Sequence, residues 1–209
     1  MQLAAHELYD LNELTMSCVN SITNMDYMLD HVTDPEFRAI LEEHFPYHVR
    51  DYNMKVEFLN NKQGAKKELP RFKIDGRLTS YTESMVNEYP SVQPRTTIKD
   101  LNDREMITAY LLTLKRAGRE YAWAAMEAAN PEIRGFLETA FLMSCAHAYD
   151  VWQYMTQKGY YPLEQASQQM TTKIGNVYKV VPEDQARVSQ LSKQYQASVE
   201  GNSQNMYQQ

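Results

Sequence analysis

Three histidines are the residues whose type and spacing could do chemistry. His44 and His48 are four residues apart, so on a helix both imidazoles would lie on one face and could bind one metal ion. His147, distant in sequence, falls on a matching apolar stripe and could meet His48. The alternative is that His48 is half-buried and hydrogen-bonded across the bundle and that His44 is solvated. These three are weak metal candidates, and we expect no catalytic residue and no cofactor.

Four long segments show the spacing of apolar residues that is typical of bundle helices. The first covers residues 5–32 and the second runs from Asp34 to residue 61. The third starts at Asn102 and the fourth runs from Asn130 to Gly159. The predicted buried stripe of the first helix is Leu8, Leu11, Thr15, Cys18, Ile22, Met25, Leu29 and Val32, and that of the second is Phe37, Leu41, Phe45, His48 or Val49, Tyr52, Val56 and Leu59.

The ends of these segments carry recognisable capping residues. Asp34 is a good N-cap residue. Pro35 fits the first helical position, because the N–H group that proline lacks would have no partner there. Asn102 with Glu105 resembles a capping box, and Gly159 is a natural residue just past a helix end. Pro46 lies inside the second helix, where we expect a kink.

An internal repeat organises the chain. The segment TDPEFRAILE (33–42) aligns with ANPEIRGFLE (129–138), and five of the ten positions are identical. The same offset of 96 residues aligns the first helix with the third without a gap. We therefore predict two copies of one helical hairpin, at 5–61 and 102–159, each of which must bury its apolar face against the other.

The stretch between the hairpins, 62–101, contains several prolines and glycines and predicts a long crossover, with a short helix possible at 80–88. A crossover of this length can return along the bundle, so that the second and third helices run parallel, as in ferritin-like folds. The predicted fold is all-α: a ferritin-like four-helix bundle over 1–163, followed by an extension over 164–209.

Ferritin-like bundles often hold two metals with glutamates and Glu-x-x-His motifs. Neither the second nor the fourth helix contains Glu-x-x-His, so this ligand set is incomplete. Near the second interhelical turn, Glu127 and Arg134 predict a salt bridge, and His31 and Arg38 occupy the same places in the first repeat.

The composition excludes several classes of protein. The formal net charge is −6 and no basic stripe occurs, so we expect no nucleic-acid partner. No apolar run is long enough to span a membrane, and the start of the chain does not read as a secretion signal. Cys18 and Cys145 form no CxxC pair, and we expect two free thiols.

The extension is rich in glutamine, with ten among the 46 residues of 164–209. Pro182 could start a fifth helix with an apolar stripe at Val188, Leu191, Tyr195 and Val199. Before it, the segment around Gly175 predicts a short extended piece.

The second repeat resembles the spore coat F family of endospore-forming bacteria. The resemblance rests on the turn AMEAANPEIR and the helix end YMTQKGYYP, and is firmest over 102–162. It implies a ferritin-like fold and a structural role in the spore coat, not an enzyme. The implied partners are other spore coat proteins or further copies of the chain, and the implied location is the coat, after synthesis in the mother-cell cytoplasm. The alternative is a metal-binding or redox bundle that uses His44, His48 and His147.

Overall fold

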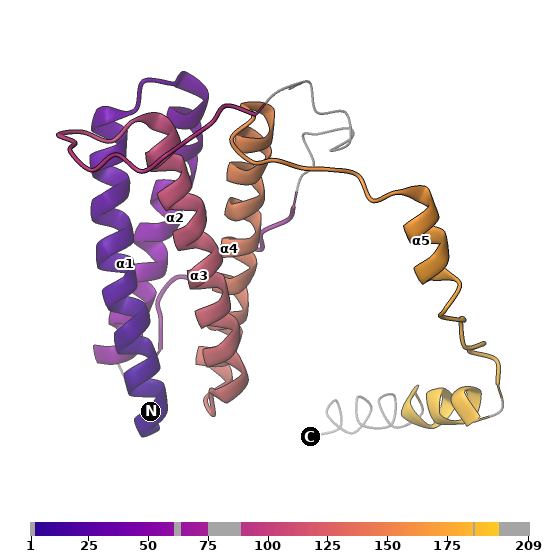
Figure 1. Cartoon of the computed structure of the whole chain (residues 1–209). Coiled ribbons are helices and arrows are strands. Elements are labelled where there is room, and N and C mark those ends of the chain that lie inside the picture. Colours follow the sequence, from indigo (N-terminus) through magenta and orange to yellow (C-terminus); the bar gives the residue numbers. More distant parts are fainter. Residues whose placement is uncertain (1–2, 61–63, 75–88, 186, 197–209) are drawn as a thin grey trace. The chain divides into compact units, whose positions relative to one another are not determined.

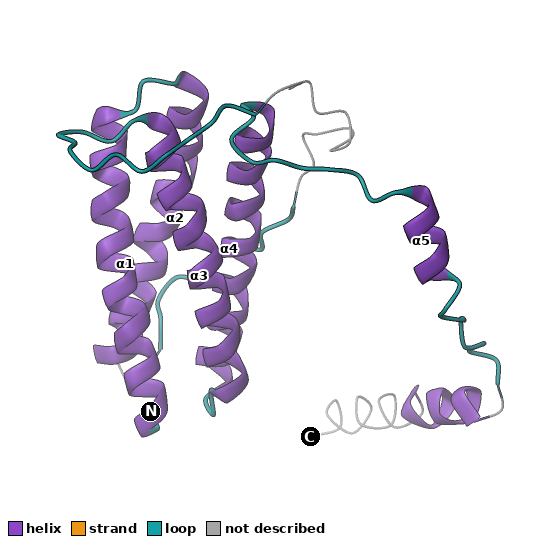
Figure 2. Ribbon diagram, viewed as in Figure 1, coloured by secondary structure: helices purple, strands orange, loops and turns teal. Residues whose placement is uncertain are grey.

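The computed structural model describes residues 3–60, 64–74, 89–185 and 187–196. Four long helices lie side by side: α1 (Ala5–His31), α2 (Pro35–Asn60), α3 (Asp103–Glu127) and α4 (Pro131–Gln157) (Figure 1). The described part of the chain is helix and loop without a strand (Figure 2). The prediction of an all-α bundle made of two hairpins is therefore confirmed.

Hydrogen bonds at the helix ends establish how the two hairpins pack. The Asp103 carboxylate at the start of α3 accepts from the backbone N–H groups of Thr33 and Asp34, at 3.0 and 2.9 Å, in the α1–α2 turn. At the other end, the Glu7 carboxylate of α1 accepts from the N–H of Asn130, at 2.7 Å, in the α3–α4 turn. Thus α1 and α3 are antiparallel, and α2 runs parallel to α3 as predicted for the long crossover.

The same contacts show the internal repeat in three dimensions. Glu7 and Asp103 are 96 residues apart, as are the turn residues Asp34 and Asn130 that they bind. Each hairpin therefore uses one carboxylate to satisfy the orphan donors of the other hairpin's turn. This reciprocal pattern supports the duplication that the sequence indicates.

The predicted caps are present. The Asn102 side chain accepts from the N–H of Glu105, and Glu105 accepts in return from the N–H of Asn102, both at 2.9 Å. Asp34 accepts from the N–H groups of Glu36 and Phe37. Gly159 has a φ of 71°, the left-handed conformation expected of the residue that ends a helix.

The predicted salt bridge at the second turn is replaced by a different contact. The Arg134 guanidinium donates to the carbonyl oxygens of Met126 and Ala128, at 3.3 and 2.6 Å, rather than to Glu127. In the first repeat, Arg38 donates to the carbonyl of Val32 at 3.2 Å. Both arginines thus bind carbonyls that the end of the preceding helix leaves without a partner.

Two predicted buried stripes were partly wrong. On α1, Leu8 is 46% exposed, while Leu14 and Ser21 are buried. On α2, His48, Asp51 and Lys55 share the interior positions of the second half with Met54 and Phe58, whereas the predicted Tyr52, Val56 and Leu59 are only half-buried. The residues of α2 that are buried are Phe37, Ile40, Leu41, His44, His48, Asp51, Met54, Lys55 and Phe58.

The chain divides into two compact units, Met1–Glu164 and Gln165–Gln209. In the second unit, α5 (Gln168–Gly175) reaches into the start of the segment around Gly175 that the sequence predicted to be extended, and residues 178–182 beyond it are not helical. Its N-cap is Ser167, whose hydroxyl accepts from the N–H of Met170 at 3.2 Å. Residues 187–196 are also helical, as the sequence predicted. The short helix predicted at 80–88 lies outside the described residues.

Candidate functional site

A layer of buried polar side chains crosses the bundle between two apolar clusters. Helix α2 supplies most of it through His44, His48, Asp51 and Lys55, whose spacing of four, three and four places all of them on one helix face. Asp51 and Lys55 are 0% exposed, and His44 is 2% exposed. The prediction that His44 is solvated was therefore wrong.

The apolar clusters on the two sides of this layer form the core. One includes Leu11, Phe58, Phe136 and Leu137. The other includes Met25, Phe37, Leu111 and Tyr154. Within the layer, α3 and α4 approach closely because α3 has Gly118 there: a Cβ on this glycine would lie 3.3 Å from the Cβ of Ser144.

At one side of the layer, the Lys55 ammonium is surrounded by three acceptors. Its Nζ lies 2.5 Å from Asp51 Oδ2, 2.9 Å from Tyr121 OH and 3.1 Å from Cys18 Sγ. Asp51 Oδ2 also accepts from the Tyr121 hydroxyl at 2.7 Å and from the Cys18 thiol at 3.0 Å. We call these four residues the lysine cluster. It joins α1, α2 and α3 and contains one opposite-charge pair.

Burial sets the protonation of the neutral members of the lysine cluster. It raises the pKa of the Cys18 thiol to about 11, and the nearby Asp51 charge acts in the same direction. Burial likewise raises the pKa of Tyr121 well above its usual value. Both groups therefore stay protonated at neutral pH. Cys18 is a thiol and not a reactive thiolate.

At the other side of the layer, three histidines meet. The rings of His44 and His147 stack with centroids 3.7 Å apart, and His48 lies 5.3 Å from His147. The hydroxyl of Tyr110 lies 3.0 Å from Nδ1 of His44 and 3.1 Å from Nε2 of His48. The structure thus brings together the three histidines that the sequence singled out, with a tyrosine hydroxyl between two of them.

Burial also keeps two of these rings neutral. It lowers the pKa of His48 to about 4; the Asp51 carboxylate opposes this shift, and the electrostatic interactions with His44 and Lys55 add to it. Burial lowers the pKa of His147 as well, and the electrostatic interactions with His44 and His48 lower it further. The His147 ring nitrogens have no hydrogen-bond partner among the described residues, so its place in the layer rests on ring packing.

In the part of the chain that the structure describes, the geometry offers no chelating site. Within the described ranges, no group of three or more His, Cys, Asp or Glu side chains is arranged to hold a metal ion. The reason lies in the ring orientations: His44 and His147 meet face to face, and one nitrogen of His44 and one of His48 point to Tyr110 instead of to a shared centre. A metal would require these rings to turn.

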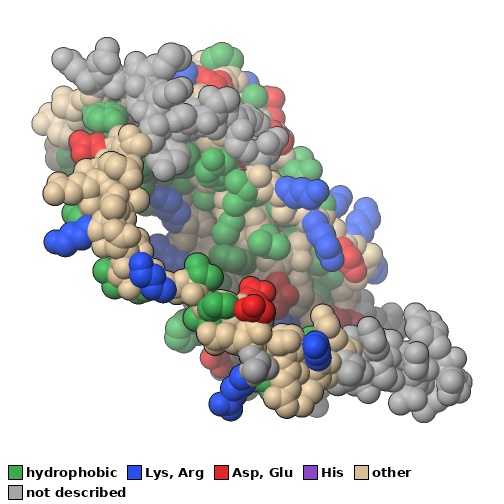
Figure 3. Space-filling model, turned by 90° about the vertical axis from the view of Figure 1, so that its right-hand side faces the viewer, with side chains coloured by type: hydrophobic (Ala, Val, Ile, Leu, Met, Phe, Trp, Pro, Cys, Tyr) green, Lys and Arg blue, Asp and Glu red, His purple; other side chains and the backbone are tan. Residues whose placement is uncertain are grey.

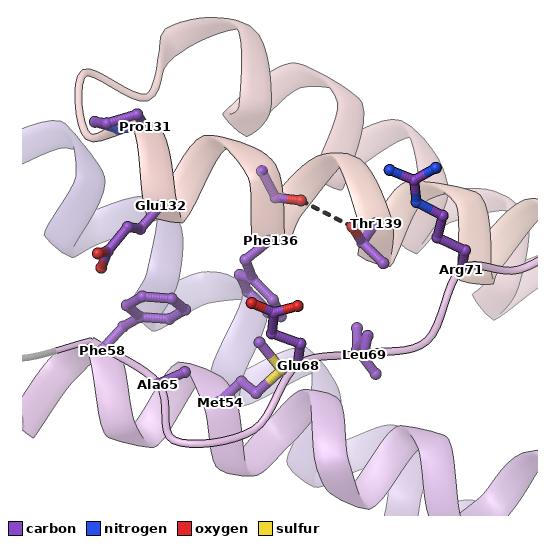
Figure 4. Close-up of a pocket in the computed structure, with 11 residues that line it drawn as sticks. Met54, Phe58, Ala65, Glu68, Leu69, Arg71, Pro131, Glu132, Phe136 and Thr139 are labelled. Carbon is purple, nitrogen blue, oxygen red and sulfur yellow. Dashed lines mark hydrogen bonds between the residues drawn. The ribbon is translucent and has the colours of Figure 1, made fainter. Parts of the chain in front are cut away.

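A pocket of about 450 Å³ lies between α2, α4 and the first part of the crossover (Figure 4). Its floor is apolar, with Phe58 and Phe136, and the carboxylates of Glu68 and Glu132 border it. Gly64 has a φ of 83° and no room for a side chain, because a Cβ would lie 2.6 Å from a carboxylate oxygen of Glu132. Arg71 also lines the pocket, and the Thr139 hydroxyl donates to the carbonyl oxygen of Gly135 at 2.9 Å.

Sequence reasoning missed Lys55. Because Lys55 is charged, it was not assigned to the apolar stripe. The structure shows that it is buried and paired with Asp51. The signal was nevertheless present, because His44, His48, Asp51 and Lys55 follow the same spacing of three and four as buried apolar residues.

Fold and site together define an all-α bundle of duplicated hairpins with a closed polar interior. Residues 102–164, which contain α3 and α4, match the model of the Coat F domain. This match confirms the resemblance to the spore coat F family that the turn and the helix end indicate. A ferritin-like superfamily membership stays a prediction.

Two similar proteins extend this likeness over most of the chain. The spore coat protein F-like protein YhcQ of Bacillus subtilis (strain 168) is 21% identical over 174 residues, which are 83% of this chain and 79% of that protein. A crystal structure of a candidate spore coat protein from Bacillus halodurans C-125 covers 80% of this chain and 97% of that one, with a TM-score of 0.59 and 11% identity. At this identity the second likeness concerns the fold alone.

Proposed function

We propose that the chain is a structural component of the bacterial endospore coat and acts through contacts with other proteins. The observation that carries this proposal is the Coat F domain match over 102–164, supported by the spore coat name of its Bacillus subtilis relative. On this account the chain is made in the mother-cell cytoplasm and then joins the coat. Among the described residues, no helix has the length and apolar character needed to cross a membrane.

The interior supports a role without catalysis. The acid–base and nucleophilic groups that the bundle brings together in the polar layer are closed to solvent: Asp51 and Lys55 are 0% exposed and His147 is 2% exposed. The hydrogen bonds of this layer to Cys18, Tyr121 and Tyr110 run between helices of the bundle, so their effect is to fix which helices pack and in which register. A substrate outside the bundle would meet none of these groups.

The surface offers apolar side chains that a partner could cover. Hydrophobic, basic and acidic side chains are all visible at the surface in Figure 3. Trp123 is 68% exposed and Tyr9 70% exposed on the outer sides of α3 and α1. Aromatic residues of this kind supply large contact areas in protein interfaces. We propose other coat proteins, or further copies of the chain, as the partners.

Spore fractionation tests this function. Purified spores of the source bacterium are extracted with detergent and reductant under conditions that remove the coat, and the chain is quantified in the extract and in the remaining spore. We expect the chain in the coat extract. Recovery in the lysate of decoated spores would overturn the proposal.

Deletion of residues 165–209 tests which part of the chain attaches it. Every described residue of this unit except Ser189 is exposed, including the apolar Ile174, Leu191 and Tyr195. A segment that buries so little cannot contribute much to a core. If the truncated chain folds but no longer enters the coat, the extension is the attachment element. Normal incorporation would place attachment on the bundle or the crossover.

The juxtaposition of His44, His48 and His147 keeps a metal-binding or redox bundle as the second candidate. Elemental analysis of the purified protein decides between the two. A stoichiometric iron, manganese or zinc content that disappears in His48→Ala would favour the metal protein. We expect no stoichiometric metal.

A further inference from the structure

The lysine cluster contains a pair of groups that the proposed structural role does not use. Cys18 Sγ on α1 and Lys55 Nζ on α2 are in direct contact at 3.1 Å. Both atoms also contact the same carboxylate oxygen, Asp51 Oδ2, at 3.0 and 2.5 Å. A thiol, an amine and a proton acceptor are thus held together in the interior, 5% exposed at Cys18 and 0% at the other two.

We propose that Cys18 and Lys55 form an oxidation-dependent covalent cross-link in which one oxygen atom bridges the thiol sulfur and the amine nitrogen. The oxidant is dioxygen, a small apolar molecule that can enter the apolar clusters on the two sides of the polar layer, as other apolar gases enter protein cores. The link would join α1 to α2 at mid-bundle and be reversed by thiol reductants.

The reaction balances with the groups at hand. Asp51 accepts one proton from the Lys55 ammonium, which leaves a free amine. The amine loses one N–H bond and the thiol its S–H bond, an N–O and an O–S bond form to one oxygen atom, and the other oxygen atom leaves as water. Nitrogen and sulfur each give up two electrons, and these four electrons reduce one dioxygen molecule.

The charges in the cluster favour the bridged product. The starting state holds an ammonium and a carboxylate in contact, both fully buried. In the product, the bridging nitrogen is neutral and Asp51 keeps the proton, so no unpaired charge remains in the interior. Tyr121, whose hydroxyl lies 2.7 Å from Asp51 Oδ2, can reorient to accept the hydrogen bond of the protonated carboxyl.

The surroundings of Cys18 disfavour the usual fates of an oxidised cysteine. The second cysteine, Cys145, lies on α4, and both are free thiols. Burial raises the pKa of Cys18, so the thiolate that would react with peroxides or disulfides is scarce. The reaction left open to Cys18 is the one with the contacting amine and a small apolar oxidant. Because the thiol is buried and protonated, we expect this reaction to be slow.

Mass spectrometry of the full-length protein tests the cross-link. Protein purified under reductant is divided and held under air or under nitrogen, and the intact mass is measured before and after dithiothreitol. Under air we expect a species that has gained one oxygen and lost two hydrogens, with the peptides of Cys18 and Lys55 joined, and dithiothreitol should restore the mass. Of the two thiols in the sequence, only Cys145 should react with a thiol reagent in the unreduced, denatured species.

Matched variants locate the link. Cys145→Ser should retain the mass change, and Cys18→Ala should abolish it. If Cys18→Ala does not fold, the mass change and the joined peptides of the unaltered protein are sufficient to test the cross-link. An unchanged mass after prolonged aeration, a gain of oxygen without loss of hydrogens, or a link through Cys145 would each overturn the proposal. Its outcome is independent of the location of the chain in the spore.

Discussion

The buried pair of Asp51 and Lys55 provides the sharpest test of how the polar layer acts on stability. Lys55→Met keeps the length of the side chain but removes the ammonium, and leaves the Asp51 carboxylate with only the neutral donors Tyr121 and Cys18. Because the site is fully buried, water cannot replace the lost partner. Removing one partner of a buried pair costs ~3–5 kcal/mol, and Asp51→Asn should cost a similar amount by stranding the ammonium.

The double variant separates the pair from its members. Lys55→Met with Asp51→Asn leaves no charge in the lysine cluster, so it should destabilise less than the sum of the single changes. We expect a coupling free energy of at least ~2 kcal/mol, measured by urea unfolding followed by circular dichroism. The exposed pair Arg116 and Glu120, also four residues apart, is the matched control, with an expected coupling below ~0.5 kcal/mol. A coupling no larger than in this control would refute the reasoning.

Three further predictions concern stability. The pKa of His48 lies at about 4 against an ordinary value of 6.5, so His48 binds fewer protons in the folded state than in the unfolded state. The free energy of unfolding should therefore fall by ~3 kcal/mol as the pH falls from 6.5 to 4. His48→Gln should flatten this pH dependence of urea unfolding, and an unchanged pH dependence would contradict the prediction. Glu7→Gln weakens a charged acceptor of the Asn130 N–H and should cost ~1–2 kcal/mol in thermal unfolding, whereas a neutral effect would exclude this contact as a clamp between hairpins. Leu137→Ala leaves a cavity at a site 2% exposed and should cost ~2–5 kcal/mol, against less than ~0.5 kcal/mol for Leu8→Ala, and equal losses would mean that the core is elsewhere.

The sequence predicted the architecture because its signals are local. A proline after an aspartate, a capping box at Asn102 and a glycine at 159 mark helix ends through backbone chemistry that depends little on the rest of the fold. The repeat of one turn at an offset of 96 residues then specified two hairpins. Their pairing followed from the need of each hairpin to bury an apolar face.

The three histidines of the polar layer were singled out from the sequence, but the lysine cluster was missed because it depends on contacts between helices. A rule that assigns charged residues to the surface places Lys55 outside, and the stripe of α2 then shifts toward Tyr52 and Val56, which are only partly buried. What keeps Lys55 inside is a carboxylate on its own helix together with groups from α1 and α3. The predicted partner of Arg134, Glu127, was wrong for a similar reason. A prediction that pairs opposite charges does not consider the unpaired backbone carbonyls at a helix end, to which Arg134 donates.

Immunogold labelling of thin-sectioned spores tests the central claim, a structural role in the coat, most directly. Antibodies against the bundle, residues 1–164, are applied to spores of the source bacterium and to spores of a strain that lacks the gene. We predict gold particles over the coat layers of the first and none above background in the second. Gold concentrated over the spore core, or confined to the mother-cell cytoplasm with an unlabelled coat, would contradict the account.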